Sequence, residues 1–393
     1  MIRRDRLAGA ARASAFAALA LSTASLGAAC AAPGARAQAA TPARASHGSP
    51  VRLYVPNQDD ATVTIVDAWS GAPLATVDLR AHGLSPNAKP HHALAEPDGS
   101  AWYVSLSGEG QILKFDRGNR LVGRVTTPAP GMLALDHRRG RLYASRSMTA
   151  VSAPSSIAVV RTGPGEFALE EDLDVLVPRP HAIVVDTVSG RTYTAGLGDN
   201  RIAVVDERGQ VRVVDVPGPN HVYVTFALSP DGRRLAASTQ LTSKLLAFDA
   251  SEPVRLRPLA SVDVLPWGYQ IAWAPDGKSV WLGNQRSDAA TQVDAERWTV
   301  AGVVRHAGFA EPHGVALTPD GATVFVSSHG RADTTHVAGT PVAPADTAHG
   351  GMHAERGARG SGTVVEIDAR TRAVRRVVPV GRYAAGIGVG GRP

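Results

Sequence analysis

Ser229-Pro230-Asp231-Gly232 is the stretch of sequence that decides the fold, because near copies of it recur through the chain. Proline presets the first dihedral angle of a turn, aspartate can bond to its own backbone, and glycine accepts a positive φ. Each copy therefore predicts a tight hairpin. The other clear copies are Glu96-Pro97-Asp98-Gly99, Ala274-Pro275-Asp276-Gly277 and Thr318-Pro319-Asp320-Gly321. Degenerate copies of the turn end at Gly140 and Gly190.

The spacing of these turns predicts the architecture. The six glycines that end them are separated by 41, 50, 42, 45 and 44 residues. A repeat of this length is typical of four-stranded propeller blades, which cannot bury their faces without neighbours. Alternating or apolar runs bounded by Gly, Pro, Asp and Asn fill the intervals and indicate strands. Inner strands are predicted to open near residues 91, 131, 181, 224, 269 and 313, which gives six complete blades.

A seventh blade is predicted to be split between the two ends of the repeat region. Residues 51–56, 62–67 and 73–78 match the second, third and fourth strands of a blade, and residues 383–389 match an inner strand. Pairing the last strand with the first blade closes the ring and removes exposed sheet edges. We therefore predict an all-β fold, a seven-bladed β-propeller of four-stranded antiparallel blades, closed by the C-terminal strand.

The first 37 residues have the composition of an export signal. Arg3, Arg4 and Arg6 precede an uncharged, Ala- and Leu-rich run over residues 13–29, which is too short and too weak for a spanning helix. We therefore expect a periplasmic or secreted protein with a linker over 38–49 and the propeller over 50–393.

Two processing sites compete within this leader. Ala35-Arg36-Ala37 fits ordinary cleavage after residue 37, whereas Gly27-Ala28-Ala29-Cys30 resembles a bacterial lipobox. In the second case the signal ends at residue 29 and a lipid on Cys30 anchors the protein. That lipid is the one membrane contact we expect.

Charge and cysteine content exclude several classes of function. The formal net charge is +6, but residues 1–37 hold five Arg against one Asp, so the remainder is close to neutral and nucleic-acid binding is not expected. Cys30 is the only cysteine. The folded part therefore has no disulfide and no thiolate for a binuclear copper centre, an iron–sulfur cluster or c-type haem attachment.

Residues 53–67 carry a family resemblance. Leu53-Tyr54-Val55-Pro56-Asn57, followed by Thr62-Val63-Thr64-Ile65-Val66-Asp67, resembles the YVTN repeat of bacterial seven-bladed propellers, and similar text recurs at residues 103–116 and 202–206. The resemblance covers about residues 50–390. It implies the propeller fold, but that family includes adhesins, nucleic-acid binders and scaffolds, so it implies no single activity.

The histidines gather on one predicted face. Loops before inner strands and loops between second and third strands share one side of a propeller, here called the channel-mouth face, and eleven of the 13 histidines fall there. His91, His181 and His313 open inner strands at matching positions, with His92 beside the first. Neutral imidazole commonly binds copper and zinc, so these four predict a metal site. The alternative is structural, because a Pro-His-Gly start is common in this repeat family.

A second resemblance bears on the metal. Pro90-His91-His92-Ala93-Leu94 looks like the double histidine of the nitrous oxide reductase propeller, which implies copper ligated by channel histidines. The matching positions in the other blades are Gly131, Val224, Tyr269 and Ala385, so the full histidine set is missing, and the cupredoxin domain of that enzyme has no counterpart. We therefore expect a smaller metal site rather than that enzyme.

An insertion is predicted at about residues 330–360. Its Ala, Gly, Thr and Pro content predicts disorder. It contains His349, Met352 and His353, and thioether with imidazole suits Cu(I). A plain surface loop is the alternative to metal capture.

No phosphate-binding loop, nucleophile elbow or Ser/His/Asp arrangement at a recognisable spacing is present. The favoured interpretation is a monomeric binding or scaffold module that takes a protein or small-molecule ligand on the channel-mouth face. A periplasmic copper- or haem-dependent oxidoreductase is the first alternative. A propeller lactonase is the second, because its catalytic residues are scattered and leave no local motif.

Overall fold

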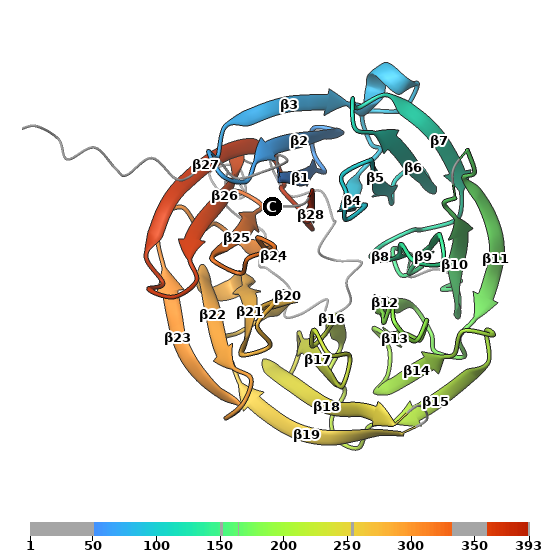
Figure 1. Ribbon diagram of the computed structural model, residues 1–393, viewed down its shortest axis with the longest axis vertical. Helices are drawn as coiled ribbons and strands as arrows, with labels where there is room; N and C mark the ends of the chain where they lie inside the picture. The colour runs from blue at the N-terminus through green and yellow to red at the C-terminus, as the bar shows by residue number, and fades with distance from the viewer. Residues whose placement is uncertain (1–50, 150–151, 164, 253–254, 332–359, 392–393) are drawn as a thin grey trace, which may run out of the picture. The chain divides into compact units, whose positions relative to one another are not determined.

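The computed structural model describes residues 51–149, 152–163, 165–252, 255–331 and 360–391. These ranges form seven four-stranded antiparallel sheets, set as blades in a ring around a common axis (Figure 1). The predicted fold class and blade number are confirmed. No helix in these ranges is long and apolar enough to cross a membrane. The export signal, the linker and most of the predicted insertion lie outside the described residues.

Each blade runs outward in chain order, and the first takes its inner strand from the C-terminal segment. The first three blades are β28 (Gly388–Gly390), β1 (Arg52–Asn57), β2 (Thr62–Asp67) and β3 (Pro73–Asp78); β4 (Pro90–Ala95), β5 (Ala101–Leu106), β6 (Gln111–Asp116) and β7 (Leu121–Thr126); and β8 (Leu133–Asp136), β9 (Arg141–Ala144), β10 (Ser156–Arg161) and β11 (Ala168–Asp174).

The remaining blades follow the same order around the ring. They are β12 (Pro180–Val185), β13 (Thr192–Gly196), β14 (Arg201–Val205) and β15 (Val211–Asp215); β16 (Tyr223–Leu228), β17 (Arg234–Thr239), β18 (Lys244–Glu252) and β19 (Arg255–Asp263); β20 (Gly268–Trp273), β21 (Ser279–Asn284), β22 (Ala289–Asp294) and β23 (Thr299–Arg305); and β24 (Pro312–Leu317), β25 (Thr323–Ser328), β26 (Ser361–Asp368) and β27 (Val374–Arg382). Short 3-10 turns, η1 (Leu79–His82) and η2 (Gln285–Ser287), complete the described elements.

The hydrophobic core lies between the blades rather than within any one of them. Every residue of β5 is buried, whereas β11 on the outer rim is almost wholly exposed. Trp102 is fully buried, and its ring stacks on Tyr54 of the first blade at 5.3 Å and on Phe115 of its own blade at 4.2 Å. Stacking of this kind explains why a blade is stable only beside its neighbours.

The Pro-Asp-Gly turns form as the sequence predicts. Gly99, Gly232, Gly277 and Gly321 have φ between 67° and 72°. The carboxylate of Asp320 accepts a hydrogen bond from the backbone N–H of Ala322 at 2.9 Å, and the other three turns repeat this contact. These carboxylates are therefore used by the turns.

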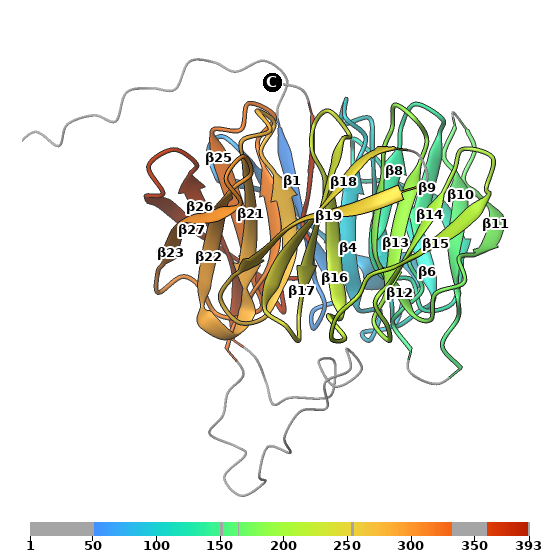
Figure 2. The same cartoon turned by 90° about the horizontal axis from the view of Figure 1, so that it is seen from below.

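The ring closes where predicted, but through a shorter strand. β28 pairs antiparallel with β1 over only three residues, and Ala385 donates its N–H to the carbonyl of Pro56 at 2.8 Å just before it. Close packing against the second blade explains the glycines here, since a Cβ on Gly388 would lie 2.4 Å from the carbonyl oxygen of Ala93. Figure 2 shows the blades side-on.

Candidate metal site at the channel mouth

A repeated backbone irregularity positions the channel-mouth residues. In five inner strands the pairing with the second strand shifts register at or beside the position of His91, His181 or His313. A bulge of this kind re-aims a side chain. Two residues earlier, one residue per blade has a left-handed φ of 49–59°, and none of the seven is glycine: Lys89, Ala129, Arg179, Val222, Trp267, Glu311 and Tyr383. Non-glycine residues rarely hold this conformation, and it clusters at functional sites.

These bulges bring three of the four predicted ligands together. The ring of His91 lies 6.0 Å from that of His181 and 6.0 Å from that of His313, measured between ring centroids. They come from the second, fourth and seventh blades, and each is at most 5% exposed. Their convergence on the channel axis is what the matching sequence positions predict.

A fourth histidine joins this group. His329 follows β25, and its ring lies 4.7 Å from that of His313 and 3.8 Å from that of Tyr383. Its Nδ1 is 3.5 Å from a carboxylate oxygen of Glu311 and 3.2 Å from Nε2 of Gln285. His329 is one of the eleven histidines predicted to lie on the channel-mouth face, but it was not among the four predicted ligands.

Glutamine side chains contact two of the four rings. Nε2 of Gln58 lies 3.1 Å from Nδ1 of His91, as Gln285 lies beside His329. Gln58, Gln285 and His329 occupy one repeated position, directly after the second strand, where each N–H bonds the carbonyl of the left-handed residue. An amide offers a donor and an acceptor, so Gln58 can support either tautomer of His91. Their shared position directly after a second strand is the feature of the sequence from which these contacts could have been predicted.

His181 has a defined tautomer. Its Nδ1 lies 2.6 Å from the carbonyl oxygen of Val224 in the next blade. A carbonyl oxygen only accepts, so Nδ1 carries the proton and Nε2 keeps its lone pair. Burial lowers the pKa of His181 to about 4, against the opposing effect of the Val224 hydrogen bond. The ring is therefore neutral at pH 7, in the form that binds a metal.

His92 lies differently from the other three predicted ligands. Its Nδ1 accepts a hydrogen bond from the backbone N–H of Leu133 at 3.1 Å, and its Nε2 is 3.3 Å from the side-chain amide of Gln270. Burial first, and His181 second, lower the pKa of His92 to about 3. Because its Nδ1 lone pair is used by the backbone, His92 is tied to the neighbouring blade. Its role as a ligand stays a prediction.

The histidine group is not a closed metal cage. In the parts of the chain that the structure describes, no three His, Cys, Asp or Glu side chains are set around one ion. The histidine side chains would therefore have to move closer together to hold a metal. His349, Met352 and His353 lie outside the described residues, so their part in metal capture also stays a prediction.

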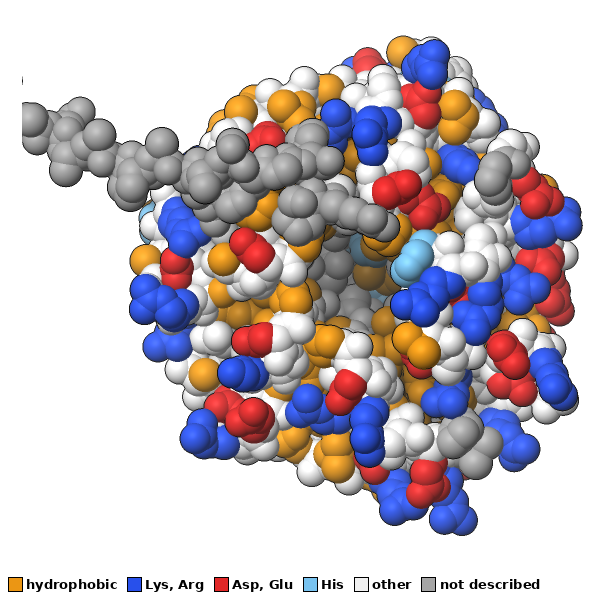
Figure 3. All heavy atoms as spheres, viewed as in Figure 1, with side chains coloured by type: hydrophobic (Ala, Val, Ile, Leu, Met, Phe, Trp, Pro, Cys, Tyr) orange, Lys and Arg blue, Asp and Glu red, His pale blue; other side chains and the backbone are white. Residues whose placement is uncertain are grey.

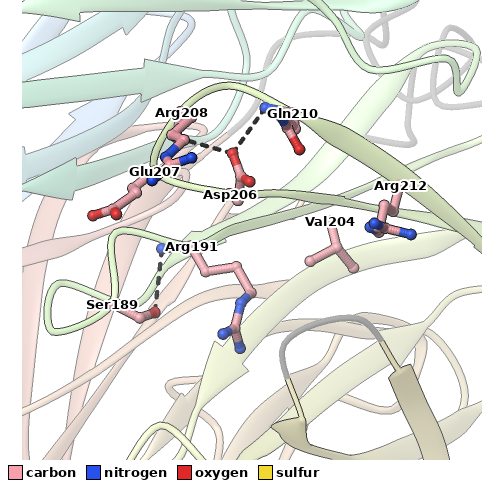
Figure 4. Close-up of a pocket in the computed structure, with 8 residues that line it drawn as sticks. All are labelled: Ser189, Arg191, Val204, Asp206, Glu207, Arg208, Gln210 and Arg212. Carbon is pink, nitrogen blue, oxygen red and sulfur yellow. Dashed lines mark hydrogen bonds between the residues drawn. The ribbon is translucent and has the colours of Figure 1, made fainter.

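A second group of polar side chains lines a cavity on the outer part of the fourth blade, and its Asp206 serves the local turn. The cavity measures about 320 Å³ and is lined by Arg191, Arg208 and Arg212 among others (Figure 4). The carboxylate of Asp206 accepts hydrogen bonds from the backbone N–H groups of Arg208 and Gln210 at 2.9 Å each (Figure 4). Those bonds hold the β14–β15 hairpin.

Comparison with solved structures agrees with the fold. The chain is similar to the periplasmic gluconolactonase of Pseudomonas aeruginosa, with 17% identity, a TM-score of 0.64, and 86% of this chain and 98% of that chain covered. They share the fold. Citrobacter koseri AztD is 12% identical with a TM-score of 0.58, and 88% of this chain and 99% of that chain are covered. The dihydro-heme d1 dehydrogenase NirN is 14% identical with a TM-score of 0.54, and 86% of this chain and 74% of that chain are covered. No protein-family model matches, and no curated protein matches, so the YVTN assignment stays a prediction.

Proposed function

We propose that this chain is an exported, monomeric β-propeller that binds a copper or zinc ion through His91, His181 and His313 at the mouth of its central channel. The observation that carries the proposal is the convergence of three histidines from equivalent positions of three blades. The ring centroid of His91 lies 6.0 Å from that of His181 and 6.0 Å from that of His313. Imidazole nitrogens suit both metals.

The surroundings of the histidines support binding rather than chemistry on a substrate. The Val224 carbonyl fixes the tautomer of His181 with its proton on Nδ1, and Gln58 contacts His91 as an outer partner of a metal ligand commonly does. A bound ion would therefore organise the channel-mouth face, where the left-handed backbone positions expose Lys89, Arg179 and Trp267 in part. A protein or small-molecule ligand would bind there.

Metal analysis tests this proposal. Protein purified from the periplasm should contain close to one copper or zinc ion per chain by mass spectrometry of the metals. His181→Ala and His313→Ala should each lower the content at least tenfold, because each removes a ligand. His137→Ala is the matched control, since His137 is exposed in a turn on the opposite face.

Two further variants separate the ligands from their neighbours. His329→Gln replaces the imidazole beside His313 by a polar amide and should weaken metal binding without abolishing it. His92→Gln tests whether the fourth predicted ligand takes part. A protein that purifies without metal, and whose melting temperature does not respond to Cu(II), Cu(I) or Zn(II), would refute the proposal.

A lactone hydrolase is the second candidate, and the His329–Glu311 pair favours it. A carboxylate 3.5 Å from an imidazole can hold it as a general base toward water. One of the similar structures is a periplasmic gluconolactonase. Hydrolysis of gluconolactone that Glu311→Gln reduces a hundredfold would favour this candidate. A haem- or copper-dependent oxidoreductase would instead show visible absorbance in the purified protein.

A further inference from the structure

The other end of the channel opens into a second cavity. It measures about 330 Å³ and lies on the face that carries the Pro-Asp-Gly turns, as its lining residue Pro97 shows. Figure 3 looks onto this face, where hydrophobic side chains line the central hollow and charged side chains gather farther out. We call this cavity the funnel. Its walls come from the inner strands of five blades, the second to the sixth, and include Leu94, Met132, Leu135, Val185, Phe226 and Ile271.

The funnel has apolar walls and a small polar floor. The described residues that line it include no Lys, Arg, Asp or Glu, and its two titratable side chains are the buried His92 and the exposed His137. The hydroxyl of Thr225 is already used, since it accepts from the N–H of Ile271 at 3.1 Å. The floor is formed by Gln270, whose Nε2 donates to the carbonyl of Ile387 at 3.3 Å and lies beside His92. A charged molecule would lose its hydration here without gaining a counter-charge.

The apolar walls are incompletely covered. Leu94, Leu135, Val184 and Val185 are only partly buried, although all four lie in inner strands. Apolar surface left in contact with water is unfavourable by about 25 cal/mol per Å². A volume of about 330 Å³ is at the lower end of the range of small-molecule sites, roughly 300–1,000 Å³.

We infer that the funnel is a binding site for a small, uncharged, largely apolar molecule, with one polar group directed at the amide of Gln270. The funnel is a concave hollow, open to solvent at one end, and its walls from five blades leave room for a small molecule rather than for a flat protein surface. Of the predicted metal ligands only His92 lines the funnel, and His91, His181 and His313 are not among its lining residues, so the inference does not depend on the metal proposal.

A neutral fluorescent probe tests this inference. N-phenyl-1-naphthylamine is apolar, carries one N–H group and fluoresces more strongly in apolar surroundings. Titration of the full-length protein should give saturable binding with one site per chain. Val185→Lys places an ammonium group in the wall and should weaken binding at least tenfold.

Leu317→Lys is the matched control. Val185 and Leu317 are each the last residue of an inner strand, in the fourth and seventh blades, and both are partly buried, but only Val185 lines the funnel. Leu317→Lys should therefore keep the affinity. Should Val185→Lys fail to fold, Val184→Phe fills the same wall with an apolar ring and should also weaken binding. Absence of saturable binding, or an equal loss in the funnel variant and the control, overturns the inference.

Discussion

Ser327→Ala is predicted to destabilise the ring at its closure. The Ser327 hydroxyl donates to the carbonyl of Ala385 at 2.6 Å and accepts from the N–H of Gly314 at 2.9 Å. Ser327 and Ala385 are fully buried. Ser105 makes the same pair of contacts between the second and third blades. The substitution leaves a buried carbonyl and a buried N–H without a partner and adds no bulk.

The expected loss follows from those two groups. Leaving a buried backbone group unsatisfied costs about 1–3 kcal/mol, so for two groups we expect the free energy of unfolding to fall by about 2–6 kcal/mol. In a domain of this size each kcal/mol lowers the melting temperature by roughly 2 °C, which gives a decrease of about 4–12 °C.

Urea unfolding followed by circular dichroism measures the change. The slope with denaturant should stay constant while the midpoint falls. Ser261→Ala is the control, because Ser261 is exposed on β19, and its effect should stay within about 0.5 kcal/mol. If Ser327→Ala unfolds at the midpoint of the control, water satisfies both groups and the reasoning from burial is wrong.

Three further predictions concern the termini and pH. Removing residues 383–393 should abolish cooperative unfolding, because it reopens the edge of β1; an unchanged thermal midpoint would contradict the closure. Cys30→Ser should release the protein from the membrane fraction if the lipobox is used and change nothing if cleavage follows residue 37, and the mass of the mature N-terminus decides between them. Burial lowers the pKa of His181 to about 4 and that of His92 to about 3, whereas in the unfolded chain both titrate near 6.5. The unfolded chain therefore binds more protons below pH 6.5, and the metal-free protein should lose stability as the pH falls from about 6.5 to about 3. His181→Gln should flatten that profile in pH-dependent urea unfolding.

The sequence predicted the blades because their turns depend on local chemistry. Gly99 and its counterparts need a positive φ, so the fold is visible wherever Pro-Asp-Gly stands. The length of the closing strand was less predictable. Residues 383–389 match an inner strand in sequence, but packing against the second blade, rather than a strand pattern, dictates Gly386 and Gly388. The ladder is therefore confined to Gly388–Gly390.

The candidate site was predictable only in part. His91, His181 and His313 share a position relative to their turns, so the repeat brings them together. His92 could be placed only from the contacts of its ring, because a bulge at the start of β4 disturbs the alternation of side chains. Gln58 and His329 belong to a different repeated position, which becomes recognisable once the second strands are aligned by their backbone bonds.

The closing pair β1 and β28 makes completion of the ring depend on both ends of the propeller. About 330 residues separate the two strands. Until β28 pairs with it, β1 presents an unpaired edge, while the blades that follow can already pack on one another. A partly folded chain of this kind stays open to edge-to-edge pairing with other copies. A chaperone that covers β1 until β28 has paired would therefore affect yield more than stability.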